Sequence, residues 1–257
     1  MPPVAAAKSQ PQSFKISLPN VSYGPFRLLE AVPWLMFASA LRFASYGKSL
    51  LMVISFVLEA IALFLAFLLA ARRMIEFTDG HTGLGKLTFA EQMRLARRVL
   101  LYVGALLFGA MVLVYLAGAH QVAPSMLLGF DGIAFDQFSK AGMVWSSMLA
   151  AIVFLMVVRV GADEPVSLLD ALKELQARAN WLLPAIVVVA AMLFGMTAIQ
   201  GMARTAVFLF WQTSAAPQSI KNIVYFVFVF GFAALRLWLV LAILTFALRQ
   251  SYRRGEA

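Results

Sequence analysis

Long apolar runs, separated by short polar segments, account for most of this chain. Five of them, each of 19 to 26 residues, occupy 50–71, 99–119, 141–160, 181–199 and 223–248. An α-helix rises about 1.5 Å per residue, so about 20 apolar residues cover the hydrocarbon core of a bilayer. A helix also satisfies its own backbone hydrogen bonds, which lipid cannot do. We therefore predict an all-α, polytopic transmembrane helical bundle.

A sixth run, at 28–46, is interrupted by Glu30, Pro33 and Arg42. A helix of this composition can cross the membrane, with Arg42 reaching up to the headgroups, or it can lie in the interface as an amphipathic helix. The chain is therefore predicted to have either six spans, or five spans and an interfacial N-terminal helix.

The 21 Lys and Arg residues are distributed unequally across the predicted bundle. If the chain crosses six times, 15 lie on the side of both termini and 5 on the opposite side, while Arg236 lies within a span. Loops rich in Lys and Arg stay in the cytoplasm. We predict a multi-pass protein of the bacterial inner (plasma) membrane. It would have a disordered cytoplasmic tail at 1–22, a bundle at 23–249 and a cytoplasmic C-terminal tail at 250–257.

Two polar segments on the cytoplasmic side carry signals for the start of a helix. Thr88 with Glu91, and Ser167 with Asp170, have the spacing of a capping box, in which the hydroxyl accepts a hydrogen bond from the helix N-terminus. Apolar residues then recur at helical spacing among charged ones. We predict two cytoplasmic amphipathic helices, each running into the span that follows. The acidic residues of the second segment are expected to be solvated charges and caps rather than metal ligands (Asp163, Glu164, Asp170 and Glu174).

Composition narrows the possible chemistry. The chain is 62% hydrophobic and 13% charged, whereas soluble domains are about 45–50% apolar and about 25% charged. It has no cysteine, which excludes disulfides and thiolate metal sites, and its two histidines, His81 and His120, lie outside the spans. We find no complete catalytic or cofactor signature and predict no cofactor and no enzymatic activity. The net charge is +9, and the charged residues cluster between apolar runs. This placement favours the lipid bilayer and other membrane-protein subunits as partners over nucleic acid.

Two charged residues fall near the middle of predicted spans. Glu59 lies 13 residues before Arg72, and Arg236 lies 13 residues before Arg249. Both are therefore expected about 20 Å from the cytoplasmic boundary. A charge at the bilayer centre costs about 2.5–3.5 kcal/mol on insertion scales, and pairing offsets part of that cost. Three interpretations follow: a structural ion pair, a polar gate or substrate-contact pair, or no pairing, with Glu59 protonated or hydrogen-bonded on its own.

Five arginines form a basic cluster next to the predicted membrane boundary: Arg72, Arg73, Arg94, Arg97 and Arg98. Such a cluster can face anionic lipid headgroups. It can equally be a simple consequence of the rule that positive loops stay inside.

The function prediction rests on topology, because no loop reaches the roughly 50 residues of an independent domain. Two small-residue pairs, Ala105/Gly109 and Ala191/Gly195, are expected to let helices pack closely. We predict an integral membrane protein without a catalytic site that acts as a scaffold, an assembly factor or a subunit of a membrane complex. The alternative is a small transporter or permease component that uses the Glu59/Arg236 pair.

Overall fold

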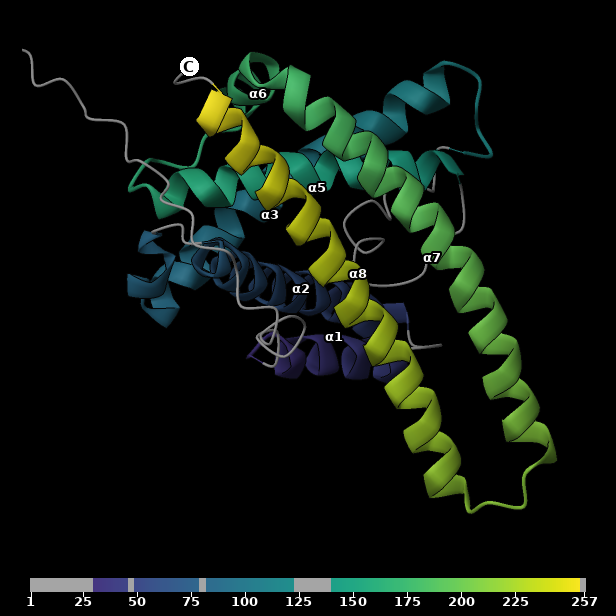
Figure 1. The fold of residues 1–257 in the computed structure, drawn as a ribbon. Coiled ribbons are helices and arrows are strands. Elements are labelled where there is room, and N and C mark those ends of the chain that lie inside the picture. The colour runs from purple at the N-terminus through teal and green to yellow at the C-terminus, as the bar shows by residue number, and fades with distance from the viewer. Residues whose placement is uncertain (1–29, 46–48, 79–81, 123–139, 255–257) are drawn as a thin grey trace, which may run out of the picture.

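The chain folds into α-helices joined by short connections. The structure, a computed structural model, describes residues 30–45, 49–78, 82–122 and 140–254, and within them it contains no strand. In this part of the chain, the seven α-helices are α1 (Val32–Ser45), α2 (Ser49–Phe77), α3 (Phe89–Leu116), α5 (Lys140–Gly161), α6 (Leu168–Ala177), α7 (Ala179–Thr213) and α8 (Gln218–Arg254), and a 3-10 turn, η3 (Gly83–Lys86), precedes α3 (Figure 1). The all-helical prediction is confirmed. The tail predicted at 1–22 lies outside the described residues, and α8 continues to Arg254, into the predicted C-terminal tail.

Five of the described helices, α2, α3, α5, α7 and α8, are long and apolar enough to cross a membrane. Each overlaps one of the five strong apolar runs. The sixth run gives only α1, whose 14 residues extend about 21 Å, less than the roughly 30 Å of a hydrocarbon core. The structure therefore supports a membrane protein with five helices of spanning length and one shorter apolar helix.

The two predicted amphipathic helices differ in the structure. The capping box of Thr88 and Glu91 is present, but it begins α3 itself, which continues without a break to Leu116. The segment predicted to begin at Thr88 and run into the next span is thus the start of α3, with no break between the two. The hydroxyl of Ser167 accepts a hydrogen bond from the backbone of Asp170 and begins α6, a separate helix of 10 residues that ends one residue before α7.

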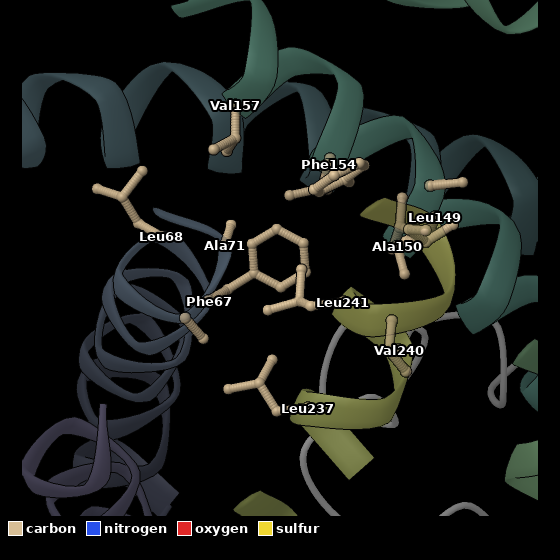
Figure 2. Packing of buried hydrophobic residues seen from close by; sticks show 14 of the residues in the cluster. Phe67, Leu68, Ala71, Leu149, Ala150, Phe154, Val157, Leu237, Val240 and Leu241 are labelled. Carbon is tan, nitrogen blue, oxygen red and sulfur yellow. The ribbon is translucent and has the colours of Figure 1, made fainter. Parts of the chain in front are cut away.

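The helix α5 is the centre of the bundle. Residues 149–157 are nine consecutive side chains that are at most 2% exposed. A helix that is apolar and buried on all sides must be surrounded by other helices, and α5 contacts α2, α3, α6, α7 and α8. Figure 2 shows Phe154 of α5 beside Phe67 of α2 and Leu241 of α8.

Burial is concentrated in one half of the bundle. Most of the buried residues lie in one set of segments, which we call the packed half: residues 62–75, 95–107, 149–157, 182–200 and 233–251. The open half consists of residues 54–61, 108–116, 201–213 and 218–232, in which Glu59 is the only described residue that is buried. In Figure 1, the connection between α7 and α8 lies well away from the other helices.

Small side chains recur along α2, the helix on which α1 packs. Ala62, Ala66 and Ala70 recur every four residues along α2 and are each at most 1% exposed. This spacing lets helices approach closely in a membrane, and α1 packs against α2 more extensively than any other pair of described helices. Glu30, just before α1, pairs with Arg73 near the end of α2, so the two helices run antiparallel.

Candidate functional site

Three polar side chains are buried well inside the apolar helices α2, α7 and α8, apart from Thr245, Arg249 and Ser251 near the end of α8. Glu59 is 9% exposed, Gln200 is 7% exposed and Arg236 is 1% exposed. The Nη2 group of Arg236 donates a hydrogen bond to Oε1 of Gln200. Because α8 packs against both α2 and α7, the structure places Glu59 and Arg236 on neighbouring helices. Their direct pairing stays a prediction.

These three residues mark the boundary between the two halves of the bundle. Along α7, Gln200 is the last buried residue, and none of residues 201–232 is buried. Along α2, the run of buried residues begins three positions after Glu59, and along α8 it begins three positions before Arg236. The polar residues therefore form one face of the packed half, next to the open half.

Sequence analysis missed Gln200, because the predicted apolar run ended at Ile199 and the amide was therefore placed just outside the span. The signal that could have identified it is chemical. A guanidinium has five N–H donors and no acceptor, so a buried arginine in a span requires acceptors on neighbouring helices. Gln200 supplies one of them to Arg236.

A second polar cluster joins the ends of four helices in the packed half. The carboxylate of Glu174 accepts hydrogen bonds from Nε of Arg178 at 3.3 Å and from the hydroxyl of Tyr252 at 3.1 Å. It also lies 3.5 Å from Nη1 of Arg159. Arg178 donates to the hydroxyl of Ser251 at 2.7 Å and stacks over the ring of Tyr252 at 3.7 Å. Since Glu174 is engaged by all three groups, its prediction as a solvated charge was wrong.

This second cluster borders a cavity of about 660 Å³ between α5, α6 and the end of α8. Its wall carries both signs of charge, since Arg159, Lys173 and Arg178 line it together with Glu164, Asp170 and Glu174. The hydrogen bond from Ser167, assisted by Lys173 and Arg159, holds the pKa of the Asp170 carboxyl below its usual value. Among the described residues, no three His, Asp or Glu side chains gather in a way that could hold a metal ion.

The predicted basic cluster divides into two groups. Arg72 and Arg73 both pair with Glu76, and Arg73 also pairs with Glu30. Arg94, Arg97 and Arg98 are exposed along the first turns of α3. None of these three forms an ion pair within 4 Å with another residue in the described part of the chain.

The predicted small-residue pairs do not pack within the described chain. Ala105, Ala191 and Gly195 are exposed, and a Cβ added at Gly109 or Gly195 would meet no atom of the described residues within 4 Å. These positions lie on the surface of α3 and α7 instead.

The buried group of Glu59, Gln200 and Arg236 can hold helices together or contact a polar solute, and the cluster around Glu174 can fix helix ends. Comparison with protein-family models, with curated proteins and with solved structures finds no match for this chain.

Proposed function

We propose that this protein is a non-enzymatic subunit or assembly factor of a membrane complex, and that its open half binds an apolar transmembrane helix of another protein. The observation that carries this proposal is the end of burial at Gln200 and Arg236. Beyond these residues α7 continues for 13 residues and α8 begins 18 residues earlier. Each segment is about 20–27 Å long, and none of residues 201–232 is buried.

The composition of the open half supports a protein partner. Only Arg204 and Lys221 are charged among residues 201–232, and the exposed side chains include Met202, Ile223 and Val227. Glycine in a helix interior costs about 1 kcal/mol relative to alanine. A Cβ at Gly201 or Gly231 would meet no atom of the described residues within 4 Å. A glycine on an uncovered helix face lets a second helix approach the backbone closely.

The proposed partner is tested by purifying the full chain from native membranes in mild detergent, as wild type and as Gly201→Leu and Gly231→Leu. We expect the wild type to retain another membrane protein in fixed proportion and each leucine variant to lose it without a loss of thermal stability. Gly104→Leu on α3 is the matched control, because that position lies outside the open half and also has no close neighbour, and it should keep the partner. A wild-type chain recovered alone, or equal retention by all variants, contradicts the proposal.

The proposal includes six crossings with both termini in the cytoplasm of a bacterial inner membrane. The pairing of Glu30 with Arg73 holds the start of α1 beside the end of α2. The other end of α2, at Ser49, lies 24 residues from Arg73, or about 36 Å. The chain between Glu30 and Ser49 thus passes from one end of α2 to the other, although α1 itself is short. This supports a crossing, and the bias of Lys and Arg supports the orientation.

Transport is a second candidate, because Glu59, Gln200 and Arg236 lie where the open half begins. The chain lacks cysteine, so a Gln200→Cys variant contains a single thiol. Labelling of that thiol in intact membranes by a water-soluble maleimide would support a wet pathway and therefore transport. Protection, with Ser214→Cys labelled fully as a control, would support a dry structural cluster and the first proposal.

A further inference from the structure

We propose that the first turns of α3, with Arg94, Arg97 and Arg98, bind the headgroup of one anionic phospholipid, whose acyl chains lie along the exposed apolar face of the same helix. This site lies on α3, whereas the partner helix is proposed to bind the α7–α8 segments 201–213 and 218–232, and it does not depend on that partner.

The positions of these residues on α3 match the shape of a phospholipid. Residues three or four apart in a helix share a face, so Arg94, Arg97 and Arg98 lie in line with Leu101 and Phe108. Leu101 is 66% exposed and Phe108 is 61% exposed. Phe108 lies 10 residues beyond Arg98, or about 15 Å, which is the thickness of one leaflet of a roughly 30 Å hydrocarbon core. Charged and apolar parts are thus spaced like a headgroup and its chains.

The arginines of this face form no ion pair within the described part of the chain, in contrast to the neighbouring basic pair, although Arg94 interacts electrostatically with Glu91. Arg72 and Arg73 are neutralised by Glu76 and Glu30. The three arginines of α3 have no ion-pair partner within 4 Å in the described ranges. Guanidinium groups bind phosphate oxygens with paired N–H donors, so this face is suited to bind the phosphodiester of a lipid headgroup.

A hollow beside the arginines gives the headgroup a second wall. This cavity of about 200 Å³ lies between the start of α3 and residues 164–166, and Arg94 and Arg98 line it. Two carboxylates also line it, but both are already engaged. Glu91 accepts hydrogen bonds from Thr88 in the capping box, and Glu164 pairs with Arg159. The net field therefore favours an anionic headgroup over a zwitterionic one.

The test is native mass spectrometry of the purified full chain with added phosphatidylglycerol or phosphatidylcholine of equal chain length. We expect one phosphatidylglycerol to be retained in preference to phosphatidylcholine. Replacement of all three arginines by glutamine should abolish that preference, whereas replacement of all three by lysine should keep most of it. Equal binding of the two lipids by the wild type, or undiminished preference in the glutamine variant, would overturn the proposal.

A single variant keeps the test decisive if the triple glutamine variant fails to insert. Arg98→Gln should weaken phosphatidylglycerol binding about fivefold, the equivalent of about 1 kcal/mol for one charge near a lipid surface. Lys173→Gln is the charge-matched control, because Lys173 is highly exposed and lies on α6. It should leave binding unchanged. An equal effect of the two substitutions would show that only net charge matters and would reject a defined site.

Discussion

The packed half and the open half share the helices α2, α3, α7 and α8, and both are rich in apolar residues, yet only the packed half forms a core. In the packed half, α5 supplies side chains that are buried on every side. In the open half, α7 and α8 also carry many apolar residues, but none of residues 201–232 is buried. Lipid tails are as apolar as leucine, so apolar character alone does not decide which surface meets protein. Packing geometry and polar contacts decide it.

The largest expected difference between the halves comes from removing a large side chain. Phe154→Ala in α5 should lower the free energy of unfolding by about 3 kcal/mol or more, because it leaves a cavity in the packed half. Phe208→Ala in α7 should change it by less than about 1 kcal/mol, because Phe208 is half-exposed. Denaturant unfolding in detergent measures both. Comparable losses would show that the open half is packed as well.

Adding a methyl group should change the stability in opposite directions at Gly161, which ends α5 beside the packed half, and at Gly231 in the open half. A Cβ at Gly161 would lie 2.3 Å from Oγ1 of Thr82, so Gly161→Ala should destabilise the protein by about 1–3 kcal/mol. At Gly231 the added Cβ meets nothing within 4 Å, and Gly231→Ala should stabilise the monomer by up to about 1 kcal/mol. Thermal unfolding of the purified monomer is the measurement. Two changes of the same sign would contradict this account.

The boundary between the halves can be tested through Gln200. Gln200→Leu leaves a buried N–H group of Arg236 without this acceptor, so unfolding should become easier by about 1–2 kcal/mol. Gln200→Glu keeps an acceptor and should cost less. If leucine is tolerated as well as glutamate, the hydrogen bond does not hold α7 to α8.

The smallest effect concerns the charged end and its pH dependence. The hydrogen bond from Arg73 lowers the pKa of Glu30 below its usual value of 4.5. The resulting stabilisation is fully present above pH 4.5 and is lost as the pH falls through the lower, folded-state pKa. Since the Glu30 side chain is 46% exposed, a few tenths of a kcal/mol are expected. The stability difference between wild type and Glu30→Gln should shrink as the pH falls below 4.5; a difference that stays constant down to the acid limit of the folded state would exclude an ionic cause.

The sequence was sufficient to predict where the helices lie in the chain but not which helices pack against each other. Apolar runs placed the five long helices, and the Thr88 and Ser167 caps were found where they were predicted. The ends of the helices were not predicted, because an apolar run marks only the part of a helix that is suited to lipid. The helix itself can extend further: α2 continues past Arg73, and α7 continues past Arg204.

The distribution of burial could not be predicted at all. The most apolar window of α3 is 11% buried and that of α5 is 67% buried, although both are read as spans from the same kind of pattern. The small pair Ala105/Gly109 resembles a packing motif, but the buried seam is Ala62, Ala66 and Ala70. A single sequence shows which segments are apolar enough for the membrane, but it does not show which apolar helix faces pack against each other.

Site-specific photocrosslinking at Val227 in native membranes tests the central claim most directly. Val227 is exposed on α8 and lies one helical turn from Gly231. We predict a single protein adduct of defined mass that disappears in Gly231→Leu, and no such adduct from a probe at Phe154 in the packed half. Adducts with lipid alone at Val227, or a protein adduct unaffected by Gly231→Leu, would contradict the assignment of the open half as a binding surface for another helix.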